Sequence, residues 1–339
     1  MSAKPVIAVI GGIGAQGTSV IKALAEGNQY TILGLTRSAS QPNVVELAKL
    51  PNVKIVEGNW YDEPTLFKVF EEADYAYVNT NGPAIGQRNE TYWGIRIFEI
   101  ARSCGISHYQ WASLPYSSKL GDYDQQFKCG HTDGKGRVAE FIKSQPTTPM
   151  KWTIHTTVPY LELLFNFFGP CRYPETPGLV SFPSALGDGK VPLIYLDDIG
   201  RYARWIFDHP ERSTGINLQV SSVSTTWDDV AKAFNNVTGQ KAEHKRLTIE
   251  EAVDLYPGND MLLGQTFDPH DPTLLSVGQN FSGMLTMLAS GKVLDLINYH
   301  LLDDILPDRL RSVEDWMRKV EYTGEHKEVI TKDWSRGGK

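Results

Sequence analysis

The sequence VIAVIGGIGAQG, residues 6–17, places an apolar run directly before a glycine-rich turn. Gly12, Gly14 and Gly17 have the spacing G-x-G-x-x-G. In such a turn the first glycine permits a tight bend, the second lets the backbone approach a pyrophosphate, and the third allows the helix to pack closely on the strand. The N-terminus of the following helix attracts phosphate charge. The stretch therefore predicts a strand, a turn and a helix that together bind a dinucleotide.

The end of the second predicted strand indicates which dinucleotide is bound. NAD sites usually carry Asp or Glu there to bind the ribose 2′-hydroxyl. This strand ends in Thr36-Arg37-Ser38, and Arg37 can pair with a 2′-phosphate, which favours NADP(H); the alternative for Arg37 is a solvated loop charge. The other expected cofactor contacts lie in the turn and after the strands: Ala15, Gln16, Ser38, Asn59, Asn79, Thr80, Asn81, Val158 and Tyr160.

Short β-branched or aromatic runs alternate with helical patterns through the first half of the chain. This rhythm is typical of βα units around a parallel sheet. We expect an α/β fold, with a Rossmann-type doubly wound parallel sheet and a smaller mixed C-terminal lobe. The predicted strands are residues 6–10, 30–36, 53–57, 75–79, 109–113 and 152–156, and the predicted helices are 15–26, 64–72, 92–104 and 135–144.

The 339 residues suffice for a nucleotide-binding domain and a second lobe. We place the NADP(H)-binding domain at residues 1–157, with its sheet completed by later segments. A smaller lobe that binds substrate or a partner follows at 158–330, and a disordered tail at 331–339. Within the second lobe, cap signals at Thr226, Gly239 and Thr248 predict two helices, and a last helix is expected near 311–320.

Composition excludes several classes of function. The net charge of −7 argues against direct binding of nucleic acid, which needs a clustered excess of Lys and Arg. The three cysteines have no metal-type spacing and cannot form a disulfide framework, so we expect no metal site and a reducing, cytoplasmic setting. We find no signal sequence and no run long enough to span a bilayer, and expect no membrane association.

Ser113 and the segment His131-Thr-Asp-Gly-Lys135 carry the candidate chemistry. Their order resembles that of short-chain dehydrogenases, in which a strand-end Ser and a helical Tyr-x-x-x-Lys share one face. Here His131 stands where the tyrosine, the usual proton donor, would be. We expect Lys135 or His131 to act as acid or base. The alternative is that Lys135 only holds the nicotinamide ribose and His131 only fills space.

The segments GGIGAQG (11–17), TR (36–37), HTDGKG (131–136) and PYLE (159–162) together resemble the NmrA-like family of atypical short-chain dehydrogenases. The resemblance covers most of the chain and is strongest to the NADPH-sensor type, with a weaker likeness to isoflavone-reductase-type enzymes. It implies a Rossmann domain with a smaller lobe, bound NADP(H), and Lys135 beside the nicotinamide. Some members are redox sensors that bind regulatory partners and lack the tyrosine, and others are reductases or tailoring enzymes of fungal secondary metabolism.

We expect an enzyme that acts on a bulky, apolar small molecule, with Ser113, Lys135, His155 and Glu162 as its placed polar groups. Either NADPH reduces an imine, enone or carbonyl, or groups such as Glu162 promote a rearrangement or isomerisation without net redox change. The alternative is a non-catalytic NADPH-sensing regulator that binds a protein partner. The expected substrate contacts are aromatic: Trp93, Trp111, Tyr116, Tyr160, Phe165 and Phe168, with Tyr92 and Phe167 nearby.

Overall fold

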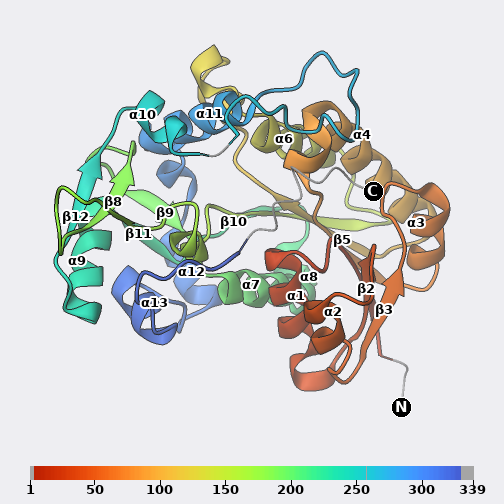
Figure 1. Cartoon of the computed structure of the whole chain (residues 1–339). Helices are drawn as coiled ribbons and strands as arrows, with labels where there is room; N and C mark the ends of the chain where they lie inside the picture. Colours follow the sequence, from red (N-terminus) through yellow and green to blue (C-terminus); the bar gives the residue numbers. More distant parts are fainter. Residues whose placement is uncertain (1–3, 257, 330–339) are drawn as a thin grey trace.

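Seven parallel strands form the main sheet, in the order β10-β6-β5-β4-β1-β2-β3 (Figure 1). The computed structural model describes residues 4–256 and 258–329. Both faces of this sheet are covered by helices, so the central strand β1 is a continuous apolar run whose residues 7–10 are fully buried. The strands are β1 (Val6–Ile10), β2 (Thr31–Thr36), β3 (Val53–Glu57), β4 (Tyr75–Val78), β5 (His108–Ser113), β6 (Lys151–Thr156) and β10 (Asn217–Gln219).

Two layers of helices enclose the sheet (Figure 1). One layer packs with Val9 and Tyr77, and the other packs with Ala8 and Val78, as the alternation of side chains along a strand requires. The first layer contains α1 (Ala15–Ala25), α2 (Pro42–Leu47), α7 (Leu196–Asp208) and α8 (Pro210–Ser213), with η1 (Glu26–Asn28) after α1. The second contains α3 (Glu63–Phe70), α4 (Gly82–Ser103) and α6 (Gly130–Lys143), followed at one end by α5 (Ser117–Leu120) and η2 (Gln125–Phe127).

The helix α6 begins earlier than the sequence predicts and includes Gly134 and Gly136, although glycine disfavours helix interiors. A Cβ at Gly134 would lie 2.8 Å from Glu90 Oε2, and one at Gly136 would lie 2.4 Å from Tyr116 Cβ. Close packing of α6 on its neighbours therefore overrides the low helix propensity of glycine. The expected juxtaposition of His131 and Lys135 on one helix is present.

The smaller lobe contains two short sheets, five α-helices and two 3-10 helices among the residues described. One sheet has the order β12-β8-β7, and β9 pairs with β11 in the other. The helix caps predicted at Thr226, Gly239 and Thr248 are present. The elements are η3 (Leu161–Phe165), β7 (Cys171–Arg172), β8 (Val180–Ser184), β9 (Val191–Leu193), β11 (Val223–Thr225), α9 (Trp227–Thr238), β12 (Ala242–Arg246), α10 (Ile249–Asp254), α11 (Val277–Ala289), η4 (Leu294–Leu296), α12 (Tyr299–Ile305) and α13 (Val313–Lys319).

The chain returns to the main sheet after entering the smaller lobe. Strand β10 pairs with β6, and α7 packs on α1 so closely that a Cβ at Gly200 would lie 2.3 Å from Ser19 O. Later segments thus complete the sheet. The tail predicted at 331–339 lies outside the described residues. Within 4–256 and 258–329, no helix has the length and apolar character to cross a membrane, and no cluster of three potential metal ligands occurs.

Candidate functional site

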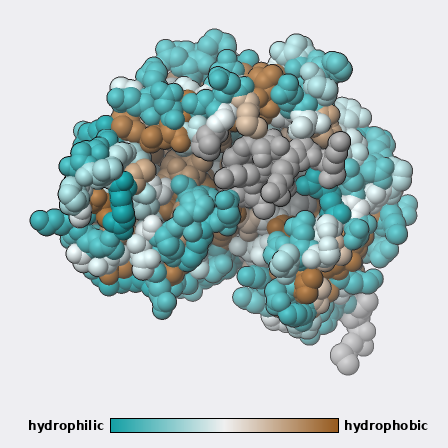
Figure 2. Space-filling view, in the orientation of Figure 1, coloured by the Kyte–Doolittle hydropathy of each residue, from teal (hydrophilic) through white to brown (hydrophobic). Residues whose placement is uncertain are grey.

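A cavity of about 810 Å³ follows the carboxyl ends of the main strands and continues into the smaller lobe. Figure 2 shows a patch of hydrophobic surface on the smaller lobe. The cavity passes the point between β1 and β4 where the strand order reverses, which is where ligands bind in doubly wound sheets. We call the portion beside the glycine turn the cleft, and the portion lined by the smaller lobe the pocket.

The glycine that forms the tight bend is not the one that the sequence predicts. Gly11, not Gly12, has the positive φ of +74° that the tight bend requires, and a Cβ there would lie 2.1 Å from Asn79 O. Gly12 is buried behind the turn. A Cβ at Gly17 would lie 2.3 Å from Gly11 O, as expected of the residue where helix meets strand. Gly14 lines the cleft, and a Cβ there would meet only one atom, at 3.9 Å.

The start of α1 fits a dinucleotide phosphate. Gly14 is the N-cap residue and supplies no side-chain cap, and the first turn contains no acidic residue. Within the described residues no side chain caps the backbone N–H groups of this turn, and Gly14, Ala15 and Gln16 line the cleft, where an anion would satisfy those groups. The buried Nε2 of Gln16 also makes no hydrogen bond within the described residues. Gln16 Oε1 accepts from Tyr160 and from Asn79, each at 3.2 Å.

Arg37 is exposed and lines the cavity, as do Lys22 and Asn43, so a 2′-phosphate could be held there. Two predicted contacts are absent from the cleft lining. The Ser38 N–H donates to Thr36 Oγ1 at 3.2 Å, and Asn59 Oδ1 accepts from the Tyr61 N–H at 3.1 Å. Both residues therefore stabilise local turns. The other predicted cofactor residues that line the cavity are Ala15, Gln16, Asn79, Thr80, Asn81, Ser113, Lys135, Val158 and Tyr160.

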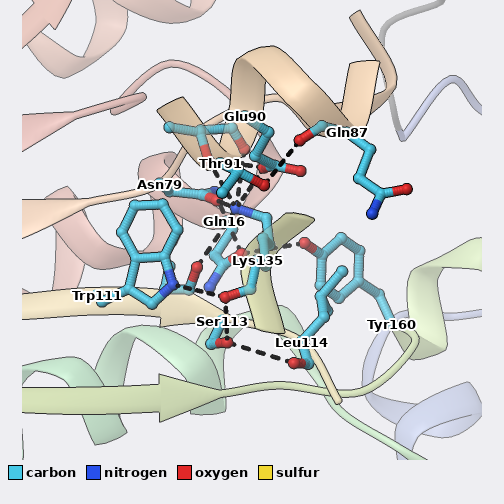
Figure 3. Close-up of polar contacts among 12 residues, drawn as sticks. Gln16, Asn79, Gln87, Glu90, Thr91, Trp111, Ser113, Leu114, Lys135 and Tyr160 are labelled. Carbon is cyan, nitrogen blue, oxygen red and sulfur yellow. Dashed lines mark hydrogen bonds and ion pairs between the residues drawn. The ribbon is translucent and has the colours of Figure 1, made fainter. Parts of the chain in front are cut away.

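Lys135 lies at the centre of the site, buried between α4 and β5 (Figure 3). Its Nζ donates to Asn79 Oδ1 and Thr80 O, each at 3.0 Å, and lies 3.3 Å from Glu90 Oε1. Burial lowers the pKa of Lys135, and the charge of Glu90 acts in the opposite direction. The ammonium group is thus held at one place beside the cleft.

Glu90 is a site residue that the sequence analysis missed. Its side chain is fully buried, Oε1 accepts from Thr80 Oγ1 at 2.7 Å, and Oε2 has no partner within the described residues. Burial raises the pKa of Glu90, and Lys135 partly offsets that rise. A Cβ at Gly82 would lie 2.0 Å from Glu90 Oε2. The absence of side chains at Gly82 and Gly134 therefore leaves space for this carboxylate. The sequence alone does not show this, because the three residues come together only in the tertiary structure.

His131 and Ser113 flank Lys135 but hold different partners. His131 Nδ1 lies 2.8 Å from the Asn280 amide nitrogen, and burial lowers the pKa of the imidazole. Its Nε2 makes no hydrogen bond within the described ranges, and the residue lines the cavity. The Ser113 hydroxyl donates to Leu114 O at 3.2 Å, so this hydroxyl is occupied within the protein (Figure 3).

Glu162 lines the pocket from η3, where its carboxylate accepts the Leu196 N–H at 3.2 and 3.3 Å. Burial raises the pKa of Glu162 to about 8, and the charge of Asp197 adds to the rise. His155, expected beside it, lies buried in the sheet with Nδ1 2.9 Å from Gln110 Nε2, and burial lowers its pKa to about 3. His155 is not part of the cavity lining.

Most of the predicted aromatic contacts pack elsewhere. Trp111 is fully buried and donates to Lys135 O, and Tyr116 accepts from Arg137 outside the cavity. Phe165 packs on Trp316 and Tyr322, Phe168 on Trp227, and Trp93 behind Tyr61. These aromatic rings do not line the cavity because they fill the core that supports it. Tyr92 is exposed and also lies outside the lining.

The pocket is lined instead by apolar residues distant in the sequence from one another. Of the expected aromatic contacts, Tyr160 and Phe167 line the cavity. The helix α11, which the sequence analysis did not predict, supplies much of the wall. The apolar residues that the smaller lobe contributes to this lining include Leu163, Phe167, Phe281, Met284, Met287, Leu288, Val293 and Val320.

Comparisons with known proteins agree with this architecture. A family model described as the NmrA-like family matches residues 3–265. An NmrA-like family domain-containing oxidoreductase of Aspergillus japonicus is 27% identical over 256 residues, 72% of this chain and 76% of its own. The structure of NmrA, a negative transcriptional regulator, in complex with NADP has a TM-score of 0.69 at 17% identity and covers 94% of this chain and 96% of its own. An NADPH-dependent quinone oxidoreductase of Escherichia coli, complexed with NADPH, has a TM-score of 0.70 at 14% identity, with coverages of 93% and 100%.

Proposed function

The chain belongs to the NmrA-like family, and we propose that it is an NADP(H)-dependent oxidoreductase that reduces a bulky, apolar small molecule. The observation that carries the proposal is the continuity of the cavity, which joins a cleft suited to a dinucleotide with an apolar pocket. Its volume of about 810 Å³ is within the usual range for small-molecule sites. The oxidoreductase relative in Aspergillus japonicus supports the same reaction class.

We propose that residues of the cleft would hold the cofactor. The first turn of α1 would bind the pyrophosphate, Arg37 would pair with the 2′-phosphate, and Lys135 would hold the nicotinamide ribose. When bound, the nicotinamide supplies a hydride. The NADP and NADPH complexes of the two structural neighbours support the choice of cofactor.

The residues of this chain position the reactants and exclude water. Asn79, Thr80 and Glu90 fix the position of the Lys135 ammonium, so that its positive charge is held beside the ribose site. Phe281 and Met284 from α11 line the pocket beside His131, whose ring centroid lies 6.0 Å from that of Phe281. A substrate held there lies in a region of low polarity, in which charges and dipoles act strongly.

A second candidate is a regulator that senses NADPH and binds a protein partner. It is favoured by His131, which occupies the position of the usual tyrosine, and by the fold shared with a negative transcriptional regulator. In that case the cofactor acts by changing the populations of two conformations, and the pocket has no substrate to bind.

The test is turnover together with a variant that fills the pocket. NADPH oxidation and product formation are followed with apolar imines, enones and carbonyls as substrates. In Met287→Trp we expect kcat/KM to fall about tenfold or more, with NADPH affinity unchanged, because the added ring occupies substrate space. Leu255→Trp, at a side chain that is 50% exposed, is the matched control. Tight NADPH binding with no turnover of any substrate would favour the regulator.

A further inference from the structure

Three carboxylates line the cavity, those of Glu162, Asp197 and Glu328, and the first two belong to neighbouring elements. Glu162 is only 9% exposed, and Asp197 lies in the first turn of α7, where it accepts from the Tyr195 hydroxyl at 2.6 Å. The N–H of Leu196, the residue before Asp197, donates to the two carboxylate oxygens of Glu162 at 3.2 and 3.3 Å, which places the two acidic residues near each other. The charge of Asp197 contributes to the raised pKa of Glu162. Glu162 also follows Tyr160, whose hydroxyl contacts Gln16 in the cleft. The acidic pair therefore lies at the junction of cleft and pocket.

No cation of the described chain neutralises this pair. Within residues 4–256 and 258–329, neither carboxylate has a Lys, Arg or His nitrogen within 4.0 Å. Lys319, whose ammonium lies 5.2 Å from the centroid of the Tyr195 ring, is exposed. Lys135 is committed to Glu90. A buried carboxylate without a counter-charge is costly, and a cationic ligand would remove that cost.

The apolar residues of the pocket also suit a cationic organic ligand. Phe167 and Phe281 present rings to the pocket, and Met284 and Met287 present thioethers. Aromatic faces attract organic cations, and methionine adapts to irregular apolar shapes. Building on the proposed function, we propose that Glu162 and Asp197 bind the positively charged nitrogen of the substrate, which is a bulky apolar imine reduced as its iminium ion.

This substrate class removes the need for the missing tyrosine. Hydride addition to the iminium carbon forms one C–H bond, and the C=N π electrons become the lone pair of a neutral amine. The nitrogen is already protonated or alkylated, so this step takes no proton from the protein. Reduction of a carbonyl would instead produce an alkoxide and require an acid. The reaction then requires no proton from His131, whose pKa is lowered, or from Lys135, whose ammonium donates to Asn79.

The test is calorimetric and does not depend on turnover. Protein saturated with NADP⁺ is titrated with 2-naphthylmethylamine, with the equally shaped 2-naphthylmethanol, and with 2-naphthoate. We expect the amine to bind about tenfold or more tightly than the alcohol, and the naphthoate to bind weakest, because one desolvated charge pair supplies the difference. Glu162→Gln should abolish the preference for the amine. Glu175→Gln, an exposed carboxylate of the same lobe outside the cavity, should keep it.

The pH dependence adds a second readout. Amine affinity should rise from pH 6 to pH 8 as Glu162 ionises, while alcohol affinity stays constant. Asp197→Asn, at an exposed position, provides a variant that keeps the fold if Glu162→Gln does not, and it should weaken the amine about threefold.

Equal affinity for amine and alcohol would overturn the inference, as would a preference that survives in both Glu162→Gln and Asp197→Asn. The proposed function is tested separately, by measuring NADPH binding and NADPH oxidation. If NADPH does not bind, that function is wrong, and the amine preference is then measured on protein without nucleotide. With turnover, an N-methyl iminium salt should be reduced and the matching ketone should not, whereas reduction of the ketone alone would contradict the assignment.

Discussion

The two ends of the cavity are built in different ways. The cleft is formed by consecutive residues, from β1 through the glycine turn into α1, and by the ends of adjacent strands. The pocket brings together η3, the start of α7 and α11, which are far apart in the chain. Backbone geometry determines what the cleft can bind, whereas individual side chains determine what fits the pocket. A substitution in one end should therefore change cofactor binding or substrate choice, but not both.

The largest effect is expected at the glycine turn. Gly14→Leu should abolish NADPH binding, because the side chain would project into open cleft where the pyrophosphate approaches. The free energy of unfolding should change by less than about 1 kcal/mol, since the backbone at Gly14, with φ −68° and ψ 171°, is open to any residue. Calorimetry and chemical denaturation measure the two quantities. Gly189→Leu, at another open glycine, is the control, and intact NADPH affinity in Gly14→Leu would place the phosphates elsewhere.

The next effect is expected at the buried ion pair. Lys135→Met should lower kcat by about 10²-fold or more and the free energy of unfolding by about 3–5 kcal/mol, because Glu90 is left buried without a counter-charge. Adding Glu90→Gln should recover most of the stability and none of the activity. Lys119→Met, which removes an exposed partner of Glu140, should cost less than about 1 kcal/mol. Chemical denaturation and initial rates are measured for the wild type, the two single variants and the double variant. Failure of the double variant to recover stability would show that the pair is not coupled.

The contrast between cleft and pocket also explains which features could be predicted from the sequence. The strand, turn and helix from residue 6 onward, and the capping at Thr226 and Thr248, are local patterns, and the structure contains them. The positive φ of Gly11 was missed because the motif fixes the spacing of glycines but not which one takes the left-handed conformation.

Residues whose environment is non-local could not be placed in the same way. Trp111 and Phe165 were assigned to the substrate because an aromatic run near a strand end has the same sequence pattern whether it faces a ligand or the core. Glu90 gave no local signal, since the space for it depends on Gly82 and Gly134. The helix α11 was missed although Ser276 and Gln279 form a capping box, because no neighbouring pattern identified what that helix covers.

A smaller effect is expected at Arg37, and it tests where the cleft binds the 2′-phosphate. Arg37→Ala should weaken NADPH binding by about 10- to 100-fold and NADH binding by less than about threefold, because only NADPH carries the 2′-phosphate. Lys54→Ala, which removes another exposed cation of the same domain, is the control and should affect neither. Fluorescence titration of both cofactors measures the ratio. Equal losses for NADPH and NADH would mean that Arg37 does not contact the phosphate.

The smallest effect concerns the pocket and follows from the titration of Glu162. Burial raises the pKa of this carboxyl from 4.5 to about 8, so between these pH values the folded protein holds a proton that the unfolded chain has released. The unfolded state therefore binds fewer protons in this window, and the free energy of unfolding should fall as the pH rises through it.

Glu162→Gln removes that dependence, because the amide does not ionise. Relative to wild type, the variant should gain about 1 kcal/mol or more between pH 5 and pH 8, since one pKa unit corresponds to ~1.4 kcal/mol. Urea denaturation at three pH values measures the difference, and Glu175→Gln should follow the wild type throughout. A constant difference across the window would mean that Glu162 is ionised in the folded protein without a ligand. The pocket would then bind its cation without releasing a proton, and the affinity for the naphthyl amine would not change with pH below 8.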